Sequence, residues 1–172
     1  SRDSSVSLLK TDGSGNEQWR KTFGVGRSYS VQQTVDGGVV VTGMDGLLTT
    51  SYDIFLLKTD GAGNEQWRKT FGMGWGNSVQ QTVDGGFVIT GEYFDGSFRT
   101  FLLKTDGSGN EQWRKNFGEG WGRSVQQTVD GGFVVTGHSG DGNVSLLKTM
   151  VKGMNSGEKH LEWVGVIRFN KR

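Results

Sequence analysis

The sequence predicts an all-β fold built from repeated four-stranded units, and three observations lead to that class. The phrase Leu-Leu-Lys-Thr begins at Leu8, Leu56, Leu102 and Leu146, which gives repeats of 48, 46 and 44 residues. Short apolar runs alternate with turns rich in Gly, Asp and Asn. No segment combines an N-terminal capping box with the apolar period of a helix.

Each repeat opens with an apolar strand, a tight turn and a second strand. In the second repeat the apolar run Ile54 to Leu57 predicts a strand that is covered on both faces. The turn D-G-A-G-N at residues 60–64 follows, where glycine supplies the positive φ angles of a hairpin. The strand E-Q-W-R-K-T-F comes next. We expect its tryptophan, Trp67, to pack between neighbouring units, together with Trp19 and Trp113 of the other repeats.

Two further strands complete the unit. The segment S-V-Q-Q-T-V-D-G-G-F-V-I-T-G at residues 78–91 predicts a hairpin that turns at Asp84-Gly85-Gly86, with Val79, Gln81 and Val83 on one face. Four strands in about 40 to 50 residues is the repeat length of a β-propeller blade. We therefore expect one repeat domain over residues 1–172, a β-propeller-like array of four-stranded antiparallel blades with about three and a half blades per chain. A half blade covers residues 1–23, full blades cover 30–71 and 78–117, and a last blade with an atypical final strand covers 124–172.

The motifs of the repeats resemble the seven-bladed β-propeller repeat of secreted bacterial and archaeal proteins. The resemblance rests on Y-D-I-F-L-L-K-T-D-G-A-G-N-E-Q-W-R-K-T-F-G followed by N-S-V-Q-Q-T-V-D-G-G-F-V-I-T-G, and it covers about Val6 to Thr149. It implies a propeller scaffold of extracellular or cell-surface proteins, used as a structural or binding element. It brings no catalytic residues with it.

Composition and motifs argue against several function classes. Nineteen basic and eighteen acidic residues, mixed along the chain, give no field that would favour nucleic acid, and no apolar run suits membrane insertion. Residues 1–10 lack the apolar core of a secretory signal, so we expect a soluble chain or a processed mature form. There is no cysteine, and neither His138 nor His160 lies in a catalytic or metal-binding motif. The D-G-S-G-N phrase lacks the later ligands of a calcium loop. We expect no enzyme activity, no metal site and no cofactor.

Two tryptophans are candidates for ligand binding. Trp75 and Trp121 lie in G-M-G-W-G-N-S and G-E-G-W-G-R-S, which we interpret as glycine-rich connections between strands. Such rings can stack on sugars, and Asn77 and Arg123 stand two residues after them as polar partners. Packing between units is the competing interpretation. The first repeat has G-V-G-R-S-Y-S at this place, without tryptophan.

The end of the chain departs from the repeat. After V-S-L-L-K-T the tail lacks the usual turn, but Leu161, Trp163, Ile167 and Phe169 alternate as in a strand. About three and a half blades do not close a ring, because propellers have four to eight blades. The sequence leaves three solutions open: a twofold dimer, head-to-tail assembly with the tail as the assembling strand, or a chain that is part of a longer propeller. We expect a non-catalytic extracellular structural or interaction protein that forms a homo-oligomer or homopolymer; the alternative is a carbohydrate-binding, lectin-like module.

Overall fold

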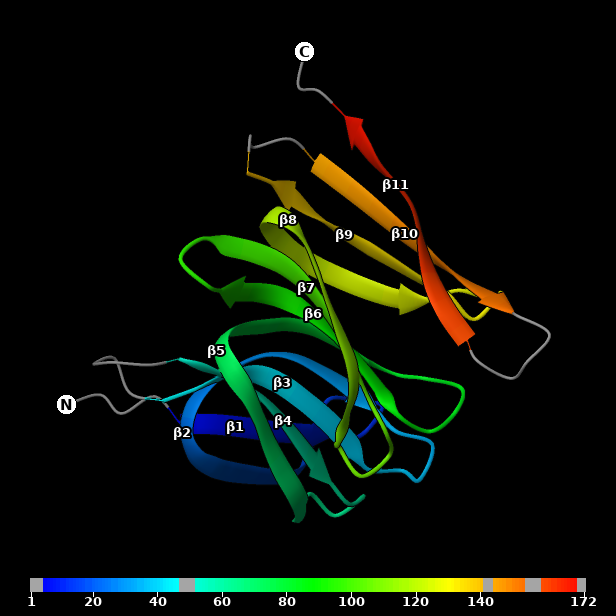
Figure 1. The fold of residues 1–172 in the computed structure, drawn as a ribbon. Helices are drawn as coiled ribbons and strands as arrows, with labels where there is room; N and C mark the ends of the chain where they lie inside the picture. Colours follow the sequence, from blue (N-terminus) through cyan, green and yellow to red (C-terminus); the bar gives the residue numbers. More distant parts are fainter. Residues whose placement is uncertain (1–4, 47–51, 141–143, 154–158, 170–172) are drawn as a thin grey trace.

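The computed structural model describes residues 5–46, 52–140, 144–153 and 159–169, the last two ranges by their backbone alone. Over these ranges eleven strands form one antiparallel sheet, in which each strand pairs with its neighbours in sequence. Figure 1 shows the strands following one another from the blue N-terminal end to the red C-terminal end. The predicted all-β class is confirmed. Within the described ranges, no helix has the length and hydropathy of a membrane span.

The strands differ in length according to their place in the repeat. They are β1 (Ser5–Thr11), β2 (Glu17–Gln33), β3 (Val39–Asp45), β4 (Asp53–Thr59), β5 (Glu65–Gln81), β6 (Phe87–Phe94), β7 (Phe98–Thr105), β8 (Glu111–Gln127), β9 (Phe133–Ser139), β10 (Val144–Gly153) and β11 (Lys159–Phe169). The three strands β2, β5 and β8 are 17 residues long, about twice the length of their neighbours.

Each long strand changes partner in its middle. Residues 65–73 of β5 pair with β4, and residues 74–81 pair with β6. The strands β2 and β8 change partner in the same way, at Gly26 and Gly120. These changes divide the sheet into four groups: group 1 has β1 and the start of β2, groups 2 and 3 have four strands each, and group 4 has the end of β8 with β9, β10 and β11.

The prediction of separate strands joined by a glycine-rich connection is wrong. Trp75 lies inside β5 and is paired with Glu92, and Trp121 lies inside β8 and is paired with His138. Glycines with positive φ let the backbone bend there and yet keep its pairing: φ is 76° at Gly72 and 154° at Gly74. A glycine-rich segment can therefore be a bent strand as well as a loop.

The turns of the repeat are hairpin turns, as predicted. In the D-G-x-G-N turn, one carboxylate oxygen of Asp60 accepts hydrogen bonds from the backbone of Ala62 and Asn64, at 2.9 and 2.8 Å. The D-G-G turn begins earlier than predicted. Strand β5 ends at Gln81, and the backbone N–H of Thr82 donates a hydrogen bond to Gly86 O across the turn. Val83, predicted to share a strand face with Val79, consequently lies at the tip of this turn and is exposed.

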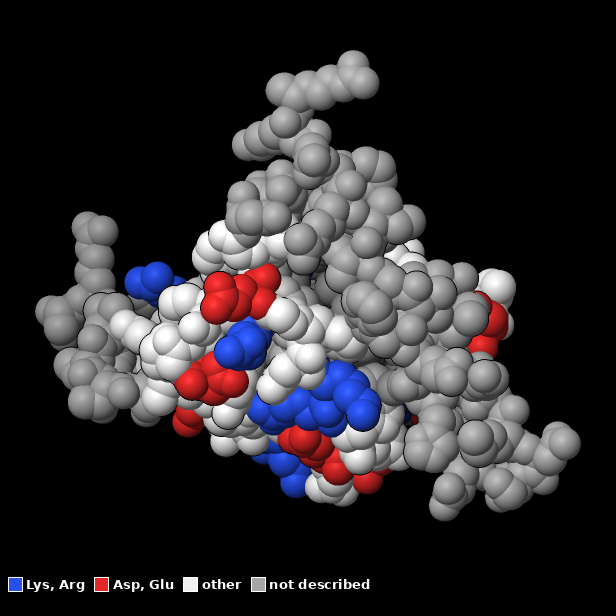
Figure 2. All heavy atoms as spheres, turned by 45° about the horizontal axis from the view of Figure 1, so that its top comes forward, with Lys and Arg blue, Asp and Glu red and all other residues white. Residues whose placement is uncertain are grey.

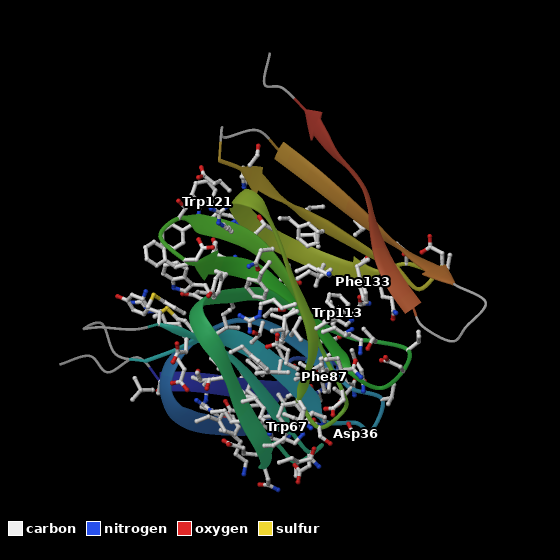
Figure 3. The ribbon with its side chains drawn as sticks, viewed as in Figure 1. Asp36, Trp67, Phe87, Trp113, Trp121 and Phe133 are labelled. Atoms are coloured by element: carbon white, nitrogen blue, oxygen red, sulfur yellow. The ribbon has the colours of Figure 1, made fainter. Side chains whose placement is uncertain are left out.

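The core lies between successive groups, in three apolar clusters. The first joins Val6, Leu8 and Phe23 of group 1 to Val41, Phe55 and Leu57 of group 2. A second cluster joins groups 2 and 3, and a third joins groups 3 and 4. Trp19, Trp67 and Trp113 are partly buried against these clusters, so the predicted packing between units is confirmed. Figure 3 shows Trp67 beside Phe87 of the next group, and their ring centroids are 5.7 Å apart.

The C-terminal strand forms as predicted. β11 pairs antiparallel with β10 along its length, with a register shift between Lys148 and Thr149. Residues 161, 163, 167 and 169 therefore lie on the last strand of group 4 of their own chain, but they do not keep one alternating face. The register shift pairs residues 161 and 163 with 151 and 149, and residues 167 and 169 with 146 and 144, so the two pairs fall on opposite faces of the sheet. The positions of their side chains lie outside the described part of the structure.

Candidate functional site

The repeated turns gather at one end of the strands. The central contact there joins a lysine to an aspartate. Lys58, at the end of β4, is buried, and its ammonium donates to both oxygens of Asp36 at 3.1 and 2.8 Å. It also donates to Thr59 O and to Gln66 Oε1. Lys104 makes the corresponding contacts with Asp84 in the next group.

The lysine changes the acidity of its partner. Hydrogen bonds from Lys58 and from the Thr34 hydroxyl hold the pKa of Asp36 at about 2, below the usual 3.8. For Asp84, burial raises the pKa, but hydrogen bonds from Thr82 and Lys104 outweigh it and the pKa is lowered. This end of the strands therefore carries ionised carboxylates that bind lysine. Figure 2 shows acidic and basic side chains interspersed on the face that it draws.

The opposite end of the strands carries the first candidate ligand residue, Trp75. Its ring stacks on Tyr52 with centroids 5.7 Å apart, and it lies 5.0 Å from the ring of Phe98. Phe98 in turn contacts Phe94, which is 39% exposed. The indole Nε1–H donates to the sulfur of Met44 at 2.9 Å. Trp75 is thus held between units, as the packing interpretation requires, in a half-buried aromatic cluster whose exposed member is Phe94.

The polar candidates Asn77 and Arg123 meet at a residue that the sequence interpretation missed. Asn77 Nδ2 donates to Glu92 Oε2 at 2.7 Å and to Gly122 O at 2.8 Å. The guanidinium of Arg123 lies 3.4 Å from the other oxygen of Glu92. Glu92 is only 5% exposed, and burial raises the pKa of its carboxyl above the usual 4.5. These contacts connect β5, β6 and β8.

Trp121 is the candidate that the structure does not bring to the others. It is half-buried in β8, and no ring contact joins it to the aromatic cluster of Trp75 within the described ranges. Figure 3 shows Trp121 on the opposite side of the molecule from Asp36, so the tryptophan lies far from the D-G-G turns at the other end of the strands.

The missed residues share one signal in the sequence. The missed residues lie in or beside the segments that differ between repeats: Tyr52, Glu92, Phe94 and Phe98. The turns at the other end of the strands are repeated almost unchanged. One position shows this clearly: it is Met44 in the first repeat, Glu92 in the second and His138 in the third. Comparing the repeats position by position could have identified these variable residues as a candidate site.

A second candidate site is an open groove of about 490 Å³ beside β1. It lies between the free edge of β1, the second half of β2, and β3, and its lining includes Leu9, Lys10, Tyr29, Val31 and Gln33. Among the strands that the structure describes, β1 ends the sheet and pairs only with β2. The groove is the place that a preceding strand of group 1 would occupy.

Residues around this end are exposed where their equivalents are buried. Val31 is 58% exposed, whereas Val79 and Val125 at the same repeat position are 5% and 4% exposed. Leu9 is 51% exposed, whereas Leu57 and Leu103 are fully buried. An apolar side chain of this size contributes about 1.5 to 3 kcal/mol when it is fully buried. In the described structure, this end of the molecule therefore exposes apolar residues whose equivalents are buried between groups.

Comparisons with known proteins give information on the fold. No model of a known protein family matches the chain, and no curated protein matches it. Among solved structures, the chain is similar to the crystal structure of Sqt1 from Chaetomium thermophilum, with a TM-score of 0.53 and 13% sequence identity. The match covers 84% of this chain and 37% of the Sqt1 chain. At this identity the likeness concerns the fold alone.

Proposed function

We propose that this chain is a non-catalytic structural or interaction protein, with its strand groups arranged as in a β-propeller, and that it self-associates through incomplete end groups. The four-stranded groups, each about one repeat long, support the propeller arrangement. The resemblance of the motifs to secreted propeller repeats favours an extracellular or cell-surface location. The exposure of Leu9 and Val31 carries the proposal of self-association.

The geometry suggests how copies would meet. Leu57 packs in the cluster between groups 1 and 2, and Leu103 packs in the cluster between groups 2 and 3. Each of these leucines therefore faces the preceding group, and no described group covers Leu9 in the same way. A second copy that places its own end group against Leu9 would extend the array, either as a closed ring or as an open fibre.

Solution mass tests this proposal. Light scattering after size exclusion should give a species larger than the 18.8 kDa chain, and its mass should fall towards that of the monomer in Leu9→Lys. Val83→Lys is the matched control, because Val83 is already exposed at a turn. A wild-type chain that stays monomeric at high concentration would refute self-association.

Carbohydrate binding is a second candidate function, favoured by the aromatic cluster around Trp75. The rings of Trp75, Phe94 and Phe98 lie together at the end of the strands where the repeats differ. The buried residue Glu92 pairs with Trp75 in the sheet and brings its carboxylate to the same region. Sugars are commonly held by an aromatic face together with a few polar groups. The contacts that Glu92 makes with Asn77 and Arg123 would compete with a sugar for the same polar atoms.

A glycan screen by thermal shift separates this function from self-association. A bound sugar raises the unfolding temperature by linkage between binding and folding. We expect the shift to disappear in Phe94→Ala, which removes an exposed ring, and to persist in Leu9→Lys at the other site. No shift with any glycan class would remove this candidate.

A further inference from the structure

We propose that the groove beside β1 is an acceptor site for a β-hairpin of a second copy of this chain, and that Lys10 recognises the aspartate of that hairpin's D-G-G turn. The inference rests on the proposed function of self-association and names the element that is exchanged. The hairpin has the sequence type of residues 78–91, which occurs in each full repeat of the chain. Exchange of an identical element between copies is a common route to oligomers.

The other groups of the same chain show what fills the corresponding groove. In group 2 the edge of β4 is covered by β3, and in group 3 the edge of β7 is covered by β6. Each covering strand is the second strand of a D-G-G hairpin. In the described part of group 1, β1 has no such strand. In group 4 the edge of β10 is covered in the same way by β9, so the free edge of β1 has the geometry that accepts this hairpin three times elsewhere in the described structure.

Charge complementarity identifies the turn of the hairpin. Lys58 and Lys104, which follow the paired leucines in groups 2 and 3, are buried under Asp36 and Asp84. Lys10 has the same position in group 1 and is exposed. No described acidic side chain forms an ion pair with it. An incoming D-G-G turn would bring an aspartate to Lys10 as it does in the other groups.

A ladder of side-chain oxygens supplies a second recognition element. Between groups 2 and 3, Ser30 Oγ accepts from Val79 N at 3.3 Å, and Gln32 Oε1 accepts from Gln81 N at 2.5 Å. In return, Gln81 Oε1 accepts from Val35 N at 2.9 Å. The same ladder recurs between groups 3 and 4.

The described part of group 1 lacks the acceptors of this ladder. Val31 N and Gln33 N hold the positions of Val79 N and Gln81 N, and no described side chain supplies an oxygen to either of them. A hairpin of sequence S-V-Q-Q-T-V-D-G-G would offer a serine oxygen to Val31 and a glutamine oxygen to Gln33. It would also cover the exposed side chain of Val31.

The hairpin at residues 124–137 is the best-placed donor. The hairpins of groups 2 and 3 contribute side chains to clusters on both of their sides, for example Val40 and Val41 of β3. Among the described residues, the hairpin of group 4 contributes only to the cluster with group 3. Its release therefore disturbs one interface where the others would disturb two.

A synthetic peptide of residues 78–91 tests the proposal against the full-length chain. Fluorescence polarisation should show binding of one labelled peptide per chain. Val31→Lys should weaken this binding at least tenfold, because it places a charge in the apolar groove. Val83→Lys, with the same change at an exposed turn, should leave it unchanged. In light scattering, excess peptide should reduce the oligomer to single chains.

A charge exchange tests the role of Lys10. Lys10→Asp should weaken binding of the natural peptide roughly tenfold, and a peptide carrying Asp84→Lys should restore it on that variant alone. Failure of the peptide to bind, with self-association that Leu9→Lys still disrupts, overturns the hairpin inference and leaves the proposed function standing. Peptide binding to a chain that is monomeric at every concentration overturns the second copy as its source, and with it self-association.

Discussion

The charged residues of the repeat join the two turns of one group of strands, as Lys58 and Asp36 do in group 2. Lys58 is buried at the end of an apolar strand, and its ammonium is satisfied by a carboxylate, a backbone carbonyl and a glutamine. This explains why the apolar run ends in Lys-Thr each time, followed by a turn that lies beside the D-G-G turn. The lysine fastens the two turns of one group together.

Lys58→Met should destabilise the protein by about 1 to 2 kcal/mol, because it removes these hydrogen bonds while Asp36 remains partly solvated. The pKa of Asp36 should rise from about 2 towards 3.8. A lowered pKa stabilises the fold above pH 3.8, and this stability is lost as pH falls towards 2. Urea unfolding of the variant should therefore show a weaker acid dependence. Lys115→Met is the control, and equal losses in both variants would contradict the assignment.

Glu92 should have the opposite pH dependence. Burial raises its pKa above 4.5, so the folded state binds the proton more tightly than the unfolded state does. Its contribution to stability is present below pH 4.5 and is lost as pH rises through the folded pKa. Glu92→Gln should therefore become more stable relative to wild type between pH 4.5 and pH 7, measured by urea unfolding at both values. A relative stability that is constant or falls with pH would show that Arg123 compensates the buried charge.

At the scale of the element, the bulge in each long strand requires a glycine in the adjacent strand. The register shifts by one residue in β5 between Gly76 and Ser78, and the backbone bulges towards β6. A Cβ on Gly91 of β6 would lie 1.8 Å from Trp75 O. Gly43 and Gly137 meet the carbonyls of Arg27 and Trp121 in the same way. The glycine of the T-G that ends each D-G-G hairpin is thus required by the bulge.

Gly91→Ala should destabilise the protein by about 3 kcal/mol or more, since strand and bulge must separate to admit the methyl group. Gly13→Ala is the control, because a Cβ there would meet nothing within 4 Å. Thermal unfolding followed by circular dichroism measures both variants. A small loss in Gly91→Ala would mean that the bulge can move to another residue.

The sequence predicted the elements with local causes and missed those with distant ones. Turns were predicted from Gly and Asp, and the packing of Trp67 from its place in an amphipathic strand, because both depend on nearby residues. The continuity of β5 could not be predicted, since G-M-G-W-G suits a loop or a bent strand equally. Glu92 was missed because its partners Asn77 and Arg123 come from other strands. Pairing of Lys58 with Asp36 spans 22 residues and required the fold.

At the scale of the whole molecule, the groups follow one another in chain order, and each core cluster of the described residues joins two successive groups. Stability in such an array depends on the number of covered interfaces, so a group at an open end should open more readily than an inner group. The strands β6 and β7 lie between two clusters, whereas β1 has one covered face and one exposed leucine. Hydrogen exchange should therefore be slow in β6 and β7 and fast in β1.

Self-association adds a concentration dependence to this pattern. Raising the protein concentration should slow exchange in β1 and at residues 28–33 of β2, where the acceptor groove lies, and should leave β6 unchanged. Val31→Lys should abolish the effect while keeping the slow exchange of the inner strands. If protection appeared instead at residues 93–98, copies would meet through the aromatic cluster. The open end of the array would then have to be covered in some other way.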